Sequence, residues 1–298
     1  MKRILKIFFL IVCGSGFLAN AQQSPHFTQY MFNDFVINPA VAGTNDYYQI
    51  RSNHRFQWVG LTDPPLTNTL SIYGPHASLP MGFGGYIYND VTGPTSRTGI
   101  TGSYAYNIEV SNDIRVSGGI SFGLLQFKLD GAQLTIKEQS DLAIQPIVYS
   151  SYVPDASIGF YAYADEWYAG FSVSQLLNNK LKIFEEKNGL NKLKSHFYLT
   201  GGYKYEINRD LVAEPSVIIK GTSPGVYQFD LTARVLYQDL VWGGLSYRLK
   251  DAISILLGYV YDEKFYFGYA YDIGINDLRS YNSGTHEIMI GYRFNDIR

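Results

Sequence analysis

The chain has 298 residues, a formal net charge of −2 and an unusually high content of tyrosine and glycine, with 26 Tyr and 29 Gly. A nucleic-acid-binding protein normally carries a basic patch, so this slightly acidic balance argues against nucleic acid as a partner. The only cysteine is Cys13, close to the N-terminus, so disulfides cannot stabilise the rest of the chain. Tyrosine-rich strands suit a protein whose aromatic rings lie at membrane–water boundaries, although a soluble β-protein can share this composition.

Residues 1–21 have the pattern of a secretory signal peptide. Three basic residues precede an apolar run over 7–18, and Ala-Asn-Ala at 19–21 follows as a small-residue cleavage site. The run is too short to span a membrane as a helix, and no later apolar stretch approaches the roughly 18 residues that such a helix needs. Val12 stands where a lipoprotein signal has a small residue, so Cys13 is not interpreted as an acylation site. We expect an exported chain that begins at residue 22.

The next segment, 22–46, shows no sustained hydrophobic period. Pro25, Pro39 and Gly43 interrupt it, so at most a short helical turn fits around 30–35. Its aromatic residues would be costly to leave unpacked in water. Because the segment precedes the first strand, we expect it to begin on the periplasmic side. There it would pack under or inside the following domain as a plug, or form a docking surface for a periplasmic partner.

From Tyr48 onward the sequence alternates with a period of two. In the stretch 227–237, for example, Tyr, Phe, Leu, Ala, Val and Tyr alternate with Gln, Asp, Thr, Arg and Leu. Alternation over ten or so residues is the length that lets a tilted strand cross a bilayer. The predicted strands are 48–58, 66–77, 80–90, 96–108, 112–127, 154–163, 167–175, 195–207, 210–220, 225–237, 239–248, 252–262, 264–273 and 283–294.

Fourteen strands is an even number, as bacterial single-chain barrels have. Counted from the first strand, every predicted connection longer than three residues is odd-numbered, so all long connections fall at one end of the sheet. A soluble sandwich gives no reason for this asymmetry, whereas an outer-membrane barrel with short periplasmic turns and long outer loops produces it directly. The sequence therefore predicts a transmembrane β-barrel over 47–298. Its two longest loops, 128–153 and 176–194, are candidate binding elements.

The last strand, 283–294, has one mostly apolar face containing Ile288, Ile290 and Tyr292, which we expect to face lipid. Its opposite face carries Glu287. Charges of both signs on the predicted inward faces fit either a selective pore or polar ligand site, or an interior held together by ion pairs. Pro215 removes one ladder donor, so a bulge or strand end is expected there.

Nothing in the sequence indicates catalysis. The five histidines are scattered without a zinc-binding pair, and there is no nucleophile elbow, phosphate loop or calcium loop. We therefore predict no catalytic residue, no metal and no cofactor.

Three blocks of sequence resemble one family. Gln-Tyr-Met-Phe-Asn at 29–33, followed by Ile-Asn-Pro-Ala-Val-Ala-Gly at 37–43, resembles the N-terminal signature of the PorP/SprF family. These are outer-membrane proteins of the type IX secretion system in Bacteroidetes. Arg-Phe-Gln-Trp-Val-Gly-Leu at 55–61 resembles the second block of the family, and Tyr-Asn-Ser-Gly-Thr-His-Glu at 281–287 resembles its closing block.

The resemblance implies a multi-pass protein of the outer membrane without enzymatic activity. It would support export and surface attachment of a specific secreted cargo protein, such as an adhesin used in gliding motility. Partners would be outer-membrane lipid, that cargo and, by the same resemblance, periplasmic components of the secretion system. The residues of the three blocks are candidate partner-binding residues, with the outer loops and 274–284 as the cargo-facing surface, although they could also merely stabilise strand ends and turns. These residues are Tyr30, Phe32, Asn38, Pro39, Ala40, Gly43, Trp58, Gly60, Tyr281, Ser283, Gly284, His286 and Glu287.

Two other functions stay open. A fourteen-strand barrel with an N-terminal plug could be an outer-membrane channel or transporter for small or hydrophobic solutes. An outer-membrane hydrolase is disfavoured because the sequence lacks a nucleophile arrangement.

Overall fold

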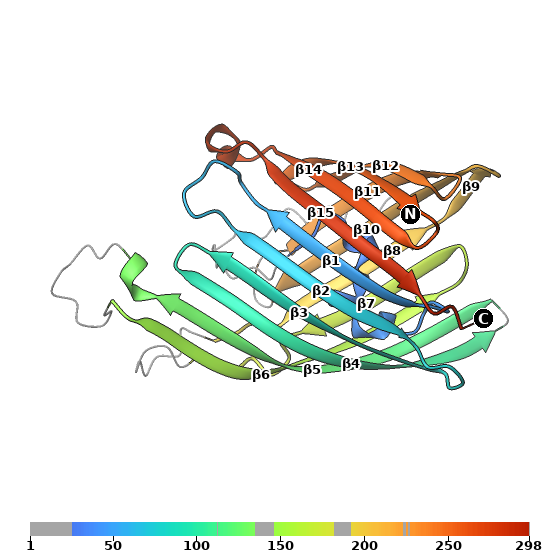
Figure 1. Ribbon diagram of the computed structural model, residues 1–298, viewed down its shortest axis with the longest axis horizontal. Coiled ribbons are helices and arrows are strands. Elements are labelled where there is room, and N and C mark those ends of the chain that lie inside the picture. Colours follow the sequence, from blue (N-terminus) through green and yellow to red (C-terminus); the bar gives the residue numbers. More distant parts are fainter. Residues whose placement is uncertain are drawn as a thin grey trace, which may run out of the picture.

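A computed structural model describes residues 26–111, 113–134, 146–181, 192–222, 225 and 227–297. The expected signal peptide at 1–21 lies outside the described residues, as do 135–145 and 182–191 of the two long loops. One antiparallel sheet closes on itself around a short N-terminal segment (Figure 1). None of the helices in the described parts of the chain is long and apolar enough to cross a membrane.

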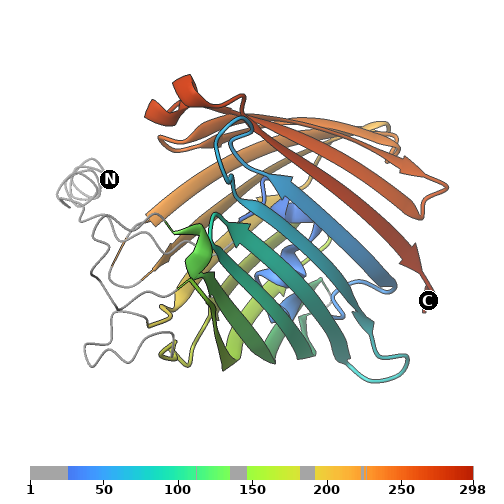
Figure 2. The same cartoon turned by 60° about the vertical axis from the view of Figure 1, so that its left-hand side comes forward.

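The wall has fourteen positions, as predicted. Its strands are β1 (Tyr48–Phe56), β2 (Leu66–Pro75), β3 (Met81–Thr92), β4 (Thr95–Ser111), β5 (Ile114–Asp130), β6 (Val148–Tyr163), β7 (Trp167–Ser174), β8 (His196–Tyr203), β9 (Tyr205–Asn208), β10 (Leu211–Thr222), β11 (Tyr227–Tyr237), β12 (Val241–Arg248), β13 (Ala252–Tyr261), β14 (Phe265–Gly274) and β15 (Thr285–Phe294). β8 and β9 are two halves of one position, separated at Lys204, because both pair with β10. The last strand pairs with the first along its length, from Tyr48 opposite Phe294 to Phe56 opposite His286, which closes the barrel (Figure 2).

The connections divide the barrel into two ends. The long-loop end holds the connections 57–65, 131–147, 175–195 and 275–284, and the short-turn end holds 112–113, 164–166, 209–210, 238–240 and 262–264. Two connections differ from the expected pattern. The β2–β3 connection at the short-turn end spans 76–80 and is longer than predicted, whereas β3 and β4 are joined at the long-loop end by 93–94 alone.

Burial alternates along the strands as the period of two requires. In β1, residues 49, 51, 53 and 55 are buried and the residues between them are more exposed. The expected lipid-facing residues Ile288, Ile290 and Tyr292 of β15 are exposed, and Met289 between them is fully buried. Apolar side chains therefore cover the outside of the wall, whereas the lumen face is mostly polar with some apolar residues such as Met289.

Pro215 interrupts the neighbouring strand, between β8 and β9, and leaves its own strand β10 continuous. β10 pairs with β11 without a break through Pro215 opposite Ala233. On its other edge, β10 pairs with β8 only as far as Ser216 opposite Gly202, and with β9 from Ala213 opposite Tyr205. Because proline has no backbone N–H to donate, the interruption at Lys204 lies beside it.

Residues 26–46 lie inside the barrel, where wall glycines leave room for them. A Cβ atom at Gly119 of β5 would overlap the backbone of Ala40, and one at Gly82 of β3 would overlap Ala42 and Gly43. Gly43 itself has a φ of 76°, a conformation that favours glycine. The wall and the inner segment are therefore shaped to each other.

Replacing Gly119 by alanine tests this fit. Overpacking of a close contact typically costs about 1–3 kcal/mol, so Gly119→Ala should lower the free energy of unfolding, measured by urea titration in detergent, by roughly that amount. Gly118→Ala is the matched control, because no atom lies within 4 Å of a Cβ at Gly118 on the same strand. Equal stabilities of the two variants would contradict a tightly seated inner segment.

Candidate functional site

The inner segment is built from three short 3-10 helices, η1 (Tyr30–Phe32), η2 (Asp34–Val36) and η3 (Pro39–Val41). Asn38 caps η3, because its side-chain oxygen accepts the N–H of Ala40 at 3.0 Å, and Pro39 occupies the first helical position. The Asn38 amide also donates to the carbonyl of Phe160 in β6 at 3.0 Å. The segment is therefore tied to the wall by the same side chain that shapes its last turn.

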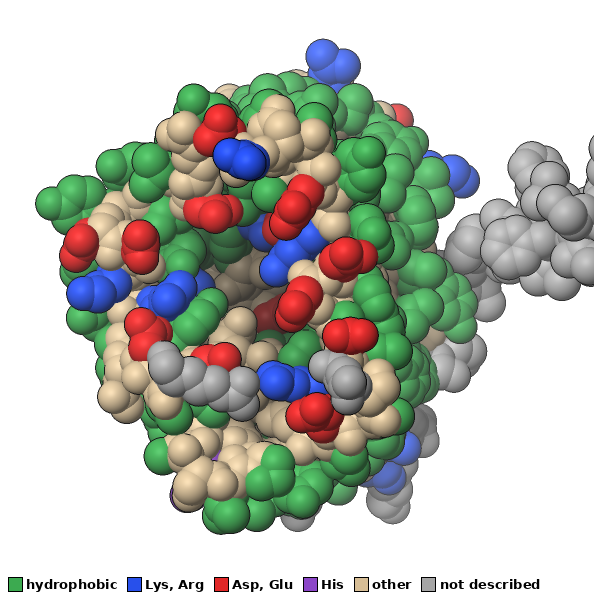
Figure 3. All heavy atoms as spheres, turned by 90° about the vertical axis from the view of Figure 1, so that its right-hand side faces the viewer, with side chains coloured by type: hydrophobic (Ala, Val, Ile, Leu, Met, Phe, Trp, Pro, Cys, Tyr) green, Lys and Arg blue, Asp and Glu red, His purple; other side chains and the backbone are tan. Residues whose placement is uncertain are grey.

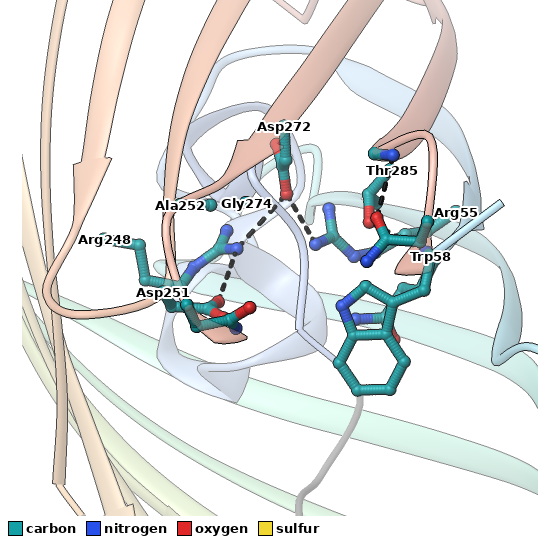
Figure 4. A pocket seen from close by; sticks show the side chains of 12 residues that line it. Arg55, Trp58, Arg248, Asp251, Ala252, Asp272, Gly274 and Thr285 are labelled. Carbon is teal, nitrogen blue, oxygen red and sulfur yellow. Dashed lines mark hydrogen bonds and ion pairs between the residues drawn. The ribbon is translucent and has the colours of Figure 1, made fainter. Parts of the chain in front are cut away.

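A buried cluster of opposite charges lies where this segment begins (Figure 4). Arg55 of β1 donates to Glu287 of β15 at 2.9 Å and to Asp272 of β14 at 2.7 Å. The exposed fractions of the Arg55 and Glu287 side chains are 1% and 0%. Charges so far from solvent are stable only when paired, and removing one partner leaves the other uncompensated.

Arg248 of β12 extends the cluster along the inner face of the wall. It contacts Asp272 and Asp251, each at 3.2 Å, and Asp230 of β11 at 3.2 Å. Lys220 of β10 also pairs with Asp230, at 3.2 Å. The cluster thus links β1 across the closing seam to five other strands, β10, β11, β12, β14 and β15.

Backbone groups of the inner segment complete the cluster. The two carboxylate oxygens of Glu287 accept the N–H groups of Thr28 at 2.7 Å and Gln29 at 2.9 Å. The Thr28 hydroxyl accepts from Arg55 and Arg248, at 2.9 and 3.0 Å, and donates to Asp272 at 2.9 Å. Hydrogen bonds to charged groups are stronger than those between neutral groups. Glu287 therefore acts as an anchor for the start of the inner segment.

His26 contacts the same cluster. Its Nε2 lies 3.2 Å from Arg55 Nη2, which can only donate, so the imidazole accepts. Burial, and then the cations Lys220, Arg248 and Arg55, lower the pKa of His26 well below its usual value. A neutral histidine fits a place crowded with positive charge.

The direction of the inner segment differs from the expectation. Its placement before β1 suggested a start at the short-turn end, which is the end taken as periplasmic. The first described residues, His26 and Thr28, instead bind Arg55, one residue before β1 ends at the long-loop end. The segment therefore runs along the lumen toward the short-turn end and reverses direction to enter β1. A sequence pattern cannot reveal this path, because 26–46 has no period that assigns it a face.

Two aromatic residues of the first block pack on the inner wall. The hydroxyl of Tyr30 lies 2.9 Å from the Ser216 hydroxyl, and its ring packs with Tyr198 and Ile218. The ring centroids of Phe32 and Trp242 are 4.5 Å apart. The guanidinium carbon of Arg234 lies 4.3 Å from the centroid of the Phe32 ring, in a cation–π contact. Asn38, Pro39 and Ala40 are buried. Residues of the first block thus contact the wall, and any contact of theirs with another protein stays a prediction.

The second and closing blocks meet at the long-loop end. The Val59 N–H donates to the Gly284 carbonyl at 2.9 Å, and the Ser283 N–H donates to the Val59 carbonyl at 2.7 Å. The Trp58 N–H donates to the Thr285 hydroxyl at 3.1 Å. Gly60 and Gly284 have φ values of 101° and 92°, which only glycine adopts without strain.

The remaining candidates of the closing block point elsewhere. His286 lies on the outer face of β15, where its Nδ1 is 2.7 Å from the Tyr269 hydroxyl. Tyr281 is 72% exposed, in the short helix η5 (Asp277–Tyr281). The closing block therefore divides into a buried anchor, Glu287, and a rim around 281–284.

Sequence reasoning missed four members of the charged cluster: Asp272, Arg248, Lys220 and Asp251. Asp272 ends a run of alternating aromatic residues in β14, and an acid there on the face opposite Tyr269 and Tyr271 was a usable signal. Arg248 is the last residue of β12, where a terminal charge is ordinarily solvated, so its burial had no local signal.

Comparison with known proteins identifies the chain's family. The family described as "Type IX secretion system membrane protein PorP/SprF" matches residues 19–292. This chain belongs to the PorP/SprF family. The match spans all three blocks, including the residues around Glu287 that hold the inner segment, and it supports an outer-membrane protein that crosses the membrane by its strands.

Solved structures show the same fold at low sequence identity. The toluene transporter TbuX of Ralstonia pickettii has a TM-score of 0.54 and 9% identity, covering 88% of this chain and 93% of its own. The toluene transporter TodX of P. putida has a TM-score of 0.50 and 9% identity, covering 87% and 92%. No curated protein sequence matches the chain. Within the described residues, no group of three or more His, Cys, Asp or Glu side chains is arranged to hold a metal ion.

Graded substitution of Glu287 tests its role as the anchor. Glu287→Ala removes both the ion pair with Arg55 and the acceptors for Thr28 and Gln29, and should lower the free energy of unfolding by roughly 3–5 kcal/mol. Glu287→Gln keeps an oxygen for one backbone N–H and should cost less. Glu263→Gln, on the exposed β13–β14 turn, is the control and should leave urea unfolding unchanged. Wild-type stability of Glu287→Ala would exclude the anchoring role.

Proposed function

We propose that this PorP/SprF protein is a non-catalytic outer-membrane component of type IX secretion that supports export and surface attachment of one cargo protein, such as a gliding adhesin. The family match supports the membrane role in secretion. The observation that carries the proposal is the filled lumen: residues 26–46 lie inside the barrel and are bound to its wall by Glu287, Asp272 and Arg55. A barrel filled in this way suits a docking or anchoring role better than a passage for cargo.

Loop lengths support an orientation for the barrel. Bacterial outer-membrane barrels have short periplasmic turns and longer extracellular loops. We therefore place the long-loop end at the cell exterior and the short-turn end in the periplasm. In this orientation the rim formed by 57–61 and 275–284 faces the exterior.

That rim is the cargo-facing surface in this proposal. Backbone hydrogen bonds between Val59, Ser283 and Gly284 hold its two loops together. Exposed Tyr281 lies beside them, and a partner can bury it. A rim pre-organised in this way loses little conformational entropy when it binds a partner.

Deleting the gene tests the secretion role. Quantitative proteomics of surface-exposed proteins should show loss of one large surface protein, while uptake of nutrients stays at the wild-type rate. Complementation with the wild-type chain is the control. Intact surface composition together with impaired uptake of a solute would reject the secretion role.

A channel for small or hydrophobic solutes is the alternative, favoured by the structural similarity to the toluene transporters TbuX and TodX. Planar-bilayer recordings separate the two functions. The purified wild-type protein should show little conductance, and deletion of 22–45 should produce a stable open pore because it empties the lumen. A large, steady conductance of the wild-type protein would favour the channel. Unchanged conductance of the deletion variant would show that these residues do not block the lumen.

A further inference from the structure

The short half-strand β9 has a free edge. β8 pairs with β10 on one side as far as Gly202, and with β7 on the other side as far as Tyr203 opposite Trp167. The last backbone hydrogen bond on the β7 side runs from the Lys204 N–H to the Glu166 carbonyl. Beyond it, among the described residues, β9 pairs with β10 alone and stands at the end of the strand order. Its outer edge therefore presents unpaired backbone donors and acceptors.

The β6–β7 turn shows that this edge lies outside the hydrocarbon layer. Asp165 and Glu166 in that turn are exposed, and Glu166 accepts a hydrogen bond from the Tyr203 hydroxyl at 3.0 Å. Carboxyl side chains are costly to place in hydrocarbon, so their exposure marks the level at which the wall leaves the apolar layer. β9 begins past this level and extends roughly 3.4 Å per residue farther. All four of its residues are exposed, with Tyr205 at 60% and Ile207 at 52%.

The surroundings of this edge are acidic. Asp165, Glu166, Glu206 and Asp210 lie around it, against the two bases Lys204 and Arg209, and all six are exposed. Among the described residues none of the six forms an ion pair. Acidic side chains also outnumber basic ones over the whole short-turn end, around a hollow at the lumen mouth (Figure 3).

We propose that the free edge of β9 is a docking site for an extended, positively charged segment of a periplasmic partner, which adds to the sheet as a strand. Unpaired strand edges bind extended peptides through backbone hydrogen bonds, and neighbouring side chains select the sequence. Here Tyr205 and Ile207 offer apolar contacts and the acidic groups select lysine or arginine. The periplasmic position rests on the orientation proposed above, whereas the binding chemistry does not.

A second copy of the chain does not fit this edge. Pairing β9 of one copy with β9 of another would bring together two surfaces that each have four acids against two bases, and juxtaposed like charges are unfavourable. A basic segment removes that repulsion and satisfies the same backbone groups.

Peptide binding to the purified full-length protein in detergent tests the proposal. The probe is a short synthetic peptide of alternating lysine and valine, and its partner peptide carries N-methyl groups on alternate residues. The first should protect the amides of 205–208 from hydrogen exchange. The N-methylated peptide keeps the charge but cannot donate backbone hydrogen bonds along one edge, so it should bind roughly tenfold more weakly than the unmethylated peptide.

Cysteine crosslinking supplies the matched control. The only cysteine lies at position 13, in the predicted signal peptide, so single cysteines can be introduced selectively. Ile207→Cys should form a disulfide with a cysteine-bearing probe peptide, and Tyr237→Cys should not, because β11 is paired on both sides at that exposed position. Equal binding of the two peptides, absence of protection at 205–208, or a dimer formed without peptide would each overturn the proposal. None of these outcomes bears on the secretion role, which the gene deletion tests.

Discussion

The buried pairing of Arg55 with Glu287 and Asp272 is the constraint on which the rest of the structure depends. These charges come from β1, β14 and β15, so they meet only when the last strand pairs with the first. Arg55 donates to one oxygen of Glu287; the same oxygen also accepts the N–H of Thr28, and the other oxygen accepts the N–H of Gln29. Because unpaired buried charges are destabilising, closure of the barrel and seating of the inner segment support each other.

The inner segment also explains features of the wall that look unrelated in the sequence. Glycines such as Gly119 and Gly82 stand where any side chain would overlap residues 39–43. Tyr30 and Phe32 fill the lumen against Tyr198 and Trp242. This packing is the basis on which we propose a docking role rather than an open pore for a barrel whose fold is similar to that of a toluene transporter. In the functions proposed above, the interaction surfaces are the two rims: the long-loop rim around 281–284 and the short-turn rim around β9.

Much of the wall could be predicted because alternation in a strand reports directly on which face is lipid and which is lumen. The boundaries that were wrong have local causes. β6 begins at Val148, earlier than predicted. The prediction started later because the serines at 150 and 151 interrupt the apolar alternation, whereas the strand extends because β5 supplies pairing partners up to Asp130 opposite Val148. Lys204 was predicted within one continuous strand. The break there arises from Pro215 on the neighbouring strand, which no pattern within 195–207 contains.

The sequence by itself determined the period of two, the number of crossings and the asymmetry of the connections, because each depends on residues close together in the chain. Glu287 became a candidate residue through the resemblance of 281–287 to the family. Only the tertiary structure decided what Glu287 does, which carboxylates and cations surround it, and that 26–46 runs inside the lumen from the long-loop half. Those facts depend on groups separated by more than two hundred residues, such as Thr28 and Glu287. Barrel closure brings them within hydrogen-bonding distance, and no local pattern encodes that.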